Sequence, residues 1–250
     1  MSGHSKWSTI KRKKGALDAN RGKIFSKLAK EITVAARVGG GDPEGNPRLR
    51  TVLIAARAQN MPKDNIDRAV KKGTGDLPGS TYEDVRYEGY APGGIAIIVE
   101  VLTDNKNRTV SEIRHLLTKN GGAMAESGAV VWNFEQRGSI TIARGAMSED
   151  EVFEKAIEAG ADDVEADTES CTIYTDPTQL HTVAQALEGM GIEPQEVTLM
   201  MAPKTTVNVT GKDASAVLRL MESLEDHDDV QNVFANFDIA EEEMASLMES

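Results

Sequence analysis

The sequence predicts an α+β protein with three domains: an N-terminal three-helix domain, a discontinuous α/β middle domain and an inserted ferredoxin-like domain. Three observations lead to this prediction. Charge is divided along the chain, because residues 1–80 contain 17 Lys and Arg and 7 Asp and Glu, whereas residues 81–250 contain 11 and 33. The spacing of apolar residues changes from helical to strand-like near Val85. Residues 139–202 then follow the order strand, helix, strand, strand, helix, strand, which is typical of a ferredoxin-like domain.

The N-terminal domain, residues 1–80, is predicted to be a basic arm followed by three short amphipathic helices. Glycines 39–41 end the first helix, because glycine favours the conformation that terminates helices. Asn46 is the predicted N-cap of the second helix, and Pro47 lies in its first turn, where the missing N–H costs nothing. The chain breaks again at Pro62, because the residue before a proline avoids the helical region, and a third helix follows.

The middle domain is predicted to begin with a strand and turn at residues 85–94. A continuous apolar strand follows at residues 95–102, and such a strand suits a sheet that is covered on both faces. The next element is a helix, for which Thr109 and Glu112 fit the spacing of a capping box.

Residues 129–135, AVVWNFE, are predicted as a further strand with Trp132 in the core. Residues 205–240 supply a strand, a helix and a strand that would complete the sheet begun near Val85, so residues 135–204 are predicted as an insertion. The predicted domains are residues 1–80, residues 81–134 with 205–240, residues 135–204, and an acidic tail at 241–250.

The arm and the first helix are the predicted site of function. Five cations precede the first acidic residue, and a concentration of positive charge in an otherwise acidic chain is a usual sign of nucleic-acid binding. Trp7 is expected to stack on bases, or alternatively to be fixed against the helical bundle. The candidate nucleic-acid-binding residues are Lys6, Trp7, Lys11, Arg12, Lys13, Lys14, Arg21, Lys23, Lys27, Lys30 and Arg37.

Other interpretations of these cations stay open. The last four share one helical face and would either follow a nucleic-acid backbone or form an ordinary solvated face. The arm would also suit a solubilising tail, a nuclear address or a transit peptide, although a transit peptide is usually Arg-rich whereas this arm is Lys-rich.

The sequence predicts no enzyme, cofactor or metal site. No glycine-rich phosphate motif is complete, the four histidines have no ligand at zinc spacing, and no nucleophile and base stand at usable spacing. Alternating carboxylates at 163–169 are interpreted as a solvated acidic face. A single cysteine, Cys171, fits a reducing compartment, and no segment approaches the ~18 apolar residues of a membrane span, so we expect a cytoplasmic protein without a membrane partner.

Four segments closely resemble the YebC/PmpR family of bacterial proteins: GHSKW at 3–7, DANRGKIFSKLAKEI at 18–32, GGGDPEGNPRLR at 39–50 and NMPKDNIDRAVKKG at 60–73. The resemblance spans essentially the whole chain. It implies a three-domain, cytoplasmic, non-enzymatic protein. Members are described as DNA-binding transcriptional regulators and others as ribosome-associated translation factors, and mitochondrial relatives activate translation of an oxidase subunit.

The leading hypothesis is a nucleic-acid-binding regulator of gene expression, a DNA-binding transcriptional regulator, whose arm and first helix bind phosphates. In this hypothesis the acidic domains fix the shape and meet the ribosome or other protein partners. One alternative is a translation factor that binds ribosomal RNA, and a second is a protein-interaction module without nucleic acid. The first helices lack clustered side chains for reading base edges, which favours structured RNA over a DNA operator.

Overall fold

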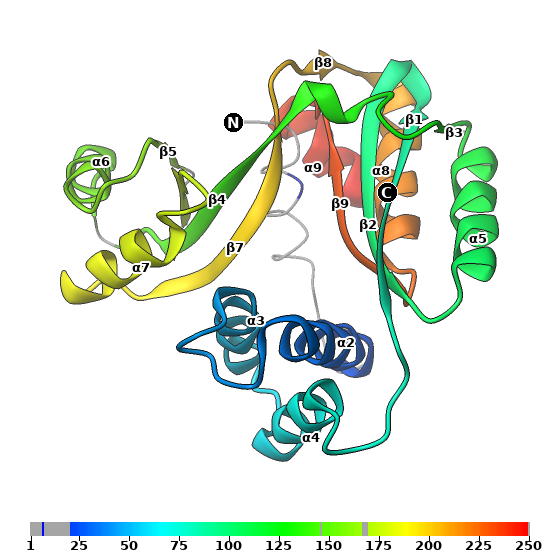
Figure 1. Cartoon of the computed structure of the whole chain (residues 1–250). Helices are drawn as coiled ribbons and strands as arrows, with labels where there is room; N and C mark the ends of the chain where they lie inside the picture. Colours follow the sequence, from blue (N-terminus) through cyan, green and yellow to red (C-terminus); the bar gives the residue numbers. More distant parts are fainter. Residues whose placement is uncertain (1–6, 8–20, 146, 167–169, 250) are drawn as a thin grey trace. The chain divides into compact units, whose positions relative to one another are not determined.

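The computed structural model describes Trp7 and residues 21–145, 147–166 and 170–249 (Figure 1). Its contacts divide the chain into two compact units. Unit 1 comprises Met1–Val34, Pro78–Glu135 and Ala202–Ser250, and unit 2 comprises Ala35–Leu77 and Gln136–Met201. Helix α2, Arg21–Gly39, contributes residues to both units. The three-domain boundaries expected from the sequence stay predictions.

Unit 1 contains a four-stranded sheet in the order β3-β1-β2-β9. The strands are β1 Glu83–Ala91, β2 Ile95–Thr103, β3 Ala123–Ala125 and β9 Val230–Ala235. All neighbouring strands are antiparallel, and β1 and β2 pair from Glu83 opposite Thr103 to Ala91 opposite Ile95. A separate two-stranded parallel sheet is formed by β8 Val207–Asn208 and β10 Phe237–Asp238. The remaining elements are α5 Lys106–Lys119, α8 Gly211–Glu225, α9 Glu241–Glu249 and the 3-10 helices η1 Pro92–Gly94 and η2 Val131–Asn133.

The core of unit 1 lies between this sheet and the two helices α5 and α8, which contact each other (Figure 1). Alternate residues of β2, including Ile97 and Val99, share a cluster with Ile113 of α5 and Leu220 of α8. Alternation follows from the strand geometry, which points every second side chain to the same face. The other face of β2 is buried as well, which confirms the expectation of a covered apolar strand.

Unit 2 contains the ferredoxin-like domain, and this part of the prediction is confirmed. Its sheet has the order β5-β6-β4-β7, in which both pairs made by β6 are antiparallel. The elements are β4 Phe134–Ala143, α6 Glu149–Glu158, β5 Asp163–Ala166, β6 Ser170–Thr175, α7 Leu180–Gly189 and β7 Pro194–Pro203. A second core cluster, which includes Ile140, Ile173 and Leu187, lies between this sheet and its helices.

Unit 2 also contains the end of α2 and the helices α3 Pro47–Ala58 and α4 Lys63–Thr74. Asn46 caps α3 as predicted, because its side chain accepts a hydrogen bond from the Leu49 N–H at 3.1 Å. Its amide also donates to the Ala35 carbonyl at 2.8 Å, so the cap connects α3 to the end of α2. In the part of the chain that the structure describes, no helix is long and apolar enough to cross a membrane.

The predicted strand at residues 129–135 is wrong for most of its length. The chain there forms η2, and Trp132 is 67% exposed rather than in the core. The physical reason is Glu88, a nearly buried residue of β1 whose carboxylate accepts the N–H groups of Val130 at 2.7 Å and Val131 at 3.0 Å. These amides are therefore directed at a side chain, and the segment cannot pair as a strand.

The predicted capping box of α5 is also wrong. The N-cap is Asn105, whose side chain accepts a hydrogen bond from the Arg108 N–H at 3.1 Å. Thr109 lies inside the helix and is fully buried, and its hydroxyl donates to Asp229 at 2.8 Å. Both residues are good caps by type, and the helix begins one turn earlier than predicted, at Asn105.

Candidate nucleic-acid interface

The predicted nucleic-acid-binding residues fall into three groups. Lys6, Lys11, Arg12, Lys13 and Lys14 lie outside the residues that the structure describes. Arg21 and Lys23 begin α2, and Arg37 lies in its last turn; all three are exposed. Lys27 and Lys30 lie between them on the same helix and are half-buried.

Trp7 is part of the core of unit 1, which corrects the expectation that it stacks on bases. Its side chain is 3% exposed and belongs to the cluster formed by the sheet with α5 and α8. The indole Nε1–H donates to the Glu225 carboxylate at 2.9 Å. A buried ring has no free face for a base. The structure supports a packing role, and the packing partners belong to the middle domain rather than to the helical bundle.

Three lysines of α2 contact the corner between α8 and β9, residues 225–229, which we call the α8–β9 corner. Lys23 Nζ donates to the Asp226 carbonyl at 3.4 Å, and Lys27 Nζ donates to the Glu225 carbonyl at 2.5 Å. Lys30 Nζ reaches further, to the Asp228 carbonyl at 3.0 Å. The last carbonyls of a helix have no partner within it and bear partial negative charge, so cations are stabilised there.

Asp229 is the centre of this contact. It is 4% exposed, and its carboxylate forms ion pairs with Lys30 at 2.7 Å and with Arg108 of α5 at 2.7 Å. Burial alone would raise the pKa of Asp229, but the hydrogen bonds from Lys30, Arg108 and Thr109 outweigh it and hold the pKa well below its usual value. Asp229, which directly precedes β9, therefore has a structural role: its buried carboxylate connects β9 to α2 and α5.

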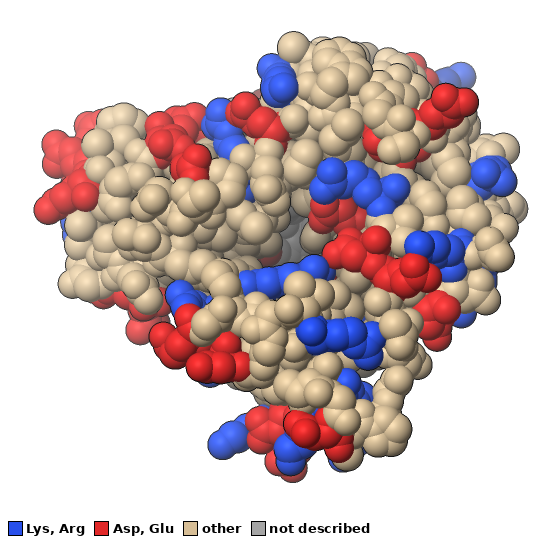
Figure 2. Space-filling view, in the orientation of Figure 1, with Lys and Arg blue, Asp and Glu red and all other residues tan. Residues whose placement is uncertain are grey.

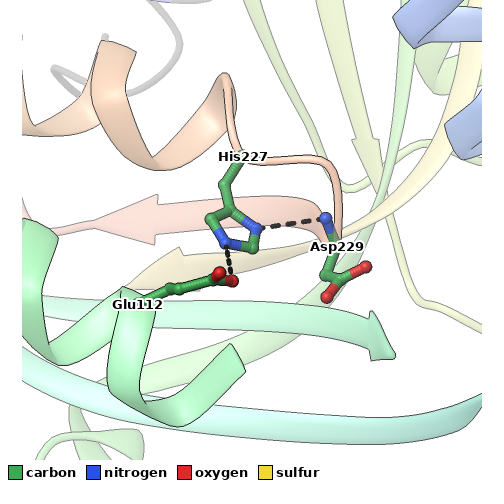
Figure 3. A group of neighbouring side chains, drawn as sticks. All are labelled: Glu112, His227 and Asp229. Carbon is green, nitrogen blue, oxygen red and sulfur yellow. Dashed lines mark hydrogen bonds and ion pairs between the residues drawn. The ribbon is translucent and has the colours of Figure 1, made fainter. Parts of the chain in front are cut away.

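Glu112, His227 and Asp229 lie close enough together to be considered as metal ligands (Figure 3). Both ring nitrogens of His227 are already engaged: Nε2 lies 2.9 Å from the Glu112 carboxylate, and Nδ1 accepts the Asp229 N–H at 3.1 Å. In Figure 3 the Asp229 carboxylate points away from the imidazole. The Asp229 carboxylate forms ion pairs with Lys30 and Arg108, and these two positive charges would repel a metal cation. Glu112, His227 and Asp229 therefore fit an ion-pair network better than a metal centre.

The electrostatic surfaces of the two units differ. On the face shown in Figure 2, the charged side chains in the part of unit 2 formed by α6, β5 and α7 are mainly acidic. Basic and acidic side chains of unit 1 lie side by side on that face, in keeping with ion pairs such as Arg86 with Glu100 and Lys106 with Glu83. Such exposed pairs contribute little stability.

Sequence reasoning missed Asp229 and Arg108. Both are ordinary charged residues in the sequence, one after a helix and one within another, and they are 121 positions apart. The local sequence signal for this ion-pair network is the run His227-Asp228-Asp229 after an apolar helix, and the same run is equally typical of a solvated turn.

Comparisons with known proteins cover the whole length of the chain. The family model for the TACO1/YebC protein N-terminal domain matches residues 5–76, and the model for the TACO1/YebC second and third domain matches residues 82–237. A protein from Desulfotalea psychrophila named "Probable transcriptional regulatory protein" is 57% identical over 250 residues, which is 100% of both chains. A protein of the same name from Geobacter sp. strain M21 is 56% identical over 248 residues, covering 99% of this chain and 100% of the relative.

One solved structure, the crystal structure of a conserved hypothetical protein from Aquifex aeolicus, is similar throughout. Its TM-score is 0.84 at 49% sequence identity, and the match covers 89% of this chain and 92% of that chain.

Proposed function

Because the chain belongs to the TACO1/YebC family, whose relatives are named as transcriptional regulatory proteins, we propose that it is a nucleic-acid-binding, non-enzymatic regulator of gene expression that binds DNA through its N-terminal region. Such a regulator acts in the cytoplasm, where its nucleic acid is found.

The proposal rests on the division of charge. Residues 1–80 have an excess of ten cations in a chain whose net charge is −12. A phosphate backbone is attracted to local positive charge, and each neutralised phosphate releases condensed counterions, which is a favourable change in free energy at low salt. The remaining 170 residues have an excess of acidic groups and would be repelled by the same polymer.

We propose a smaller set of binding residues than the sequence predicts. Arg21, Lys23 and Arg37 are exposed on α2 and are retained together with the five cations of the arm. Lys27 and Lys30 are assigned to holding α2 on the α8–β9 corner, because a phosphate would have to displace hydrogen bonds of 2.5 to 3.0 Å. Trp7 is assigned to the core.

Ribosomal RNA is the second candidate ligand, and α4 favours it. A helix that reads a DNA groove presents side chains for base edges and is attracted by the flanking phosphates. The exposed charged residues of α4 are Lys63, Arg68, Lys71 and Lys72 with Asp64 and Asp67, so the carboxylates offset half of the positive charge that would draw it into a groove. Binding through the backbone of a structured RNA needs no such helix, and a ribosome-bound translation factor would bind in this way.

Replacing Arg12, Lys13 and Lys14 together with Ala should weaken binding of the full-length protein to duplex DNA and to structured RNA alike, by roughly 10- to 100-fold at low salt. The slope of log affinity against log salt should fall by about one for each lost phosphate contact, hence by about three. Fluorescence anisotropy titrations at several salt concentrations measure both quantities.

The matched control is the triple variant of Lys119, Lys155 and Lys212 to Ala, which removes the same charge from the acidic part of the chain. It should leave the salt slope unchanged, because those lysines are not assigned to phosphates. Equal loss in the two triple variants would mean that only net charge matters and would contradict an N-terminal binding surface. A flat salt response of the wild type would favour a protein partner.

A further inference from the structure

Two aromatic side chains of unit 1 are exposed although their polar groups have hydrogen-bond partners in the protein. Trp132 of η2 is 67% exposed and Tyr90 of β1 is 41% exposed. Tryptophan is highly buried on average, and an exposed one usually keeps its N–H in water. Here the Trp132 Nε1–H donates to the Ala129 carbonyl at 2.8 Å, so hydration of this group does not explain the exposure of the ring.

The two rings are neighbours. The Tyr90 hydroxyl donates to the same Ala129 carbonyl, at 3.3 Å, which brings the polar edges of both rings to one oxygen atom. Both aromatic systems therefore stand at one site, at the junction of β1 and the loop between β3 and β4, which is green in Figure 1.

The loop under Trp132 is held from two sides. On one side Glu88, 5% exposed, accepts the N–H groups of Gly128, Val130 and Val131 at 2.7 to 3.0 Å. Burial raises the pKa of Glu88, but these hydrogen bonds more than offset it and the pKa is lowered, so the carboxylate that holds the loop stays ionised at neutral pH.

On the other side, the segment at 204–205 fixes the residue after Trp132. The Thr205 hydroxyl donates to the Asn133 side chain at 2.7 Å, and the Lys204 N–H donates to the Asn133 carbonyl at 2.7 Å. A surface that is fixed before its ligand arrives loses less conformational entropy on binding, so these contacts make the site preorganised.

The charge next to the rings identifies the class of ligand. Lys204 is exposed, and its Nζ donates to the backbone carbonyl of Trp132 at 3.0 Å, so a cation lies at the same residue as the indole. The carboxylate of Glu88 in β1 is buried under the backbone amides and is not presented to a ligand, and the loop itself has one exposed carboxylate, Glu126. Aromatic faces with an adjacent cation match an unpaired nucleotide, whose base stacks while its phosphate meets the lysine.

An apolar protein surface fits less well. Protein interfaces bury several contiguous apolar side chains. Among the described residues of unit 1, the large apolar side chains that are exposed are Ile24, Tyr90 and Trp132, and Ile24 belongs to α2. No large aliphatic side chain classed as exposed in the described part of unit 1 accompanies the two rings and the lysine, which favours stacking.

From these contacts we propose that Tyr90, Trp132 and Lys204 form a binding site for an unpaired nucleotide of single-stranded or looped RNA. The site rests on the proposed nucleic-acid function and adds a contact to it that lies outside the basic N-terminal region. It also distinguishes between ligands, because the bases of duplex DNA are paired and stacked and offer no free face to these rings.

The test compares full-length variants on a short oligoadenylate RNA and on a duplex DNA of the same length. Trp132→Ala should weaken binding of oligoadenylate about five-fold to a hundred-fold, the loss of one stacked base, and leave duplex binding unchanged. Trp132→Phe should keep most of the affinity and Trp132→Leu should not, since a ring is required rather than an apolar group. Phe153→Ala removes an exposed aromatic of α6 and is the control that should change nothing.

Tryptophan fluorescence gives a second readout. Oligoadenylate should quench the emission of the wild type but not that of Trp132→Ala, whose remaining Trp7 is buried. Equal RNA affinity of wild type and Trp132→Ala, with binding still dependent on Arg12, Lys13 and Lys14, would overturn this site and leave the proposed function intact. A wild type that binds neither polymer would overturn both. Normal RNA binding with a changed oligomeric state of Trp132→Ala would assign the rings to contact between copies and also overturn the site.

Discussion

Trp7→Ala is expected to lower the free energy of unfolding by about 3–5 kcal/mol, the usual cost of removing a large aromatic side chain from a core. Trp7 is 3% exposed and shares a cluster with residues of α5, α8 and the sheet of unit 1. The variant also loses the indole hydrogen bond to Glu225. Denaturant titration of the full-length protein, followed by far-ultraviolet circular dichroism, measures the change.

The chain offers its own control, because its second tryptophan is exposed. Trp132→Ala should change the stability by no more than about 0.5 kcal/mol, as is usual for surface substitutions. Binding of every nucleic acid should decline in parallel with folding in Trp7→Ala. If instead the unfolding transition were unchanged and only looped RNA were bound less tightly, Trp7 would be a stacking residue and its position in the core would be wrong.

Asp229→Asn is expected to destabilise the protein by about 2–4 kcal/mol, because Lys30 and Arg108 then lose the buried carboxylate that neutralises them. Asp228→Asn is the matched control. Asp228 is adjacent and exposed, and it meets Lys30 through its backbone carbonyl, which the substitution retains. Thermal unfolding of the two variants and the wild type at neutral pH gives the comparison.

The same aspartate predicts a pH dependence. The pKa of Asp229 is lowered in the folded protein, so its stabilising contribution is fully present above the unfolded value of about 4 and is lost as the pH falls below it. The difference in stability between wild type and Asp229→Asn should therefore be constant from pH 7 to about pH 5 and shrink in acid. If the difference persisted unchanged in strong acid, the stabilisation would come from the packing of the Asp229 side chain rather than from its negative charge.

Much of the secondary structure could be predicted because its causes are local. Asn46 with Pro47 is a sufficient signal for the start of α3, and the apolar run at 95–102 became the central strand β2. The alternation of strands and helices after Ser139 predicted the ferredoxin-like insertion, and the four matching segments predicted the family. These inferences need only near neighbours in the chain or similarity to known sequences.

The positions of the two tryptophans could not be predicted, because distant residues determine them. Trp7 follows Lys6 and precedes KRKK, and its sequence neighbours indicate an exposed ring, yet its hydrogen-bond partner Glu225 is 218 positions away. Trp132 lies in an apolar run that is typical of a strand, yet the backbone N–H groups before it donate to the Glu88 carboxylate instead of to a neighbouring strand. Local patterns contain no information about either partner.

The candidate nucleic-acid site stays a prediction, but the arrangement of its lysines on α2 can be compared with the structure. The helical spacing that places Lys23, Lys27 and Lys30 on one face of α2 is confirmed, since all three meet the same α8–β9 corner. Periodicity shows which residues share a face, but it does not show what that face contacts. Lys27 and Lys30 contact protein carbonyls where phosphates were expected, because the α8–β9 corner supplies oxygen acceptors of its own.

Ultraviolet crosslinking in living cells, followed by mass spectrometry of the crosslinked peptides, tests the nucleic-acid function most directly. It identifies the bound polymer and the attached residues in one measurement. The proposed function predicts nucleotide adducts on peptides from residues 1–80, on the arm and the exposed side of α2, with RNA and DNA distinguished by the attached sugar. Crosslinks to proteins alone, or nucleotide adducts confined to residues 136–201, would contradict it.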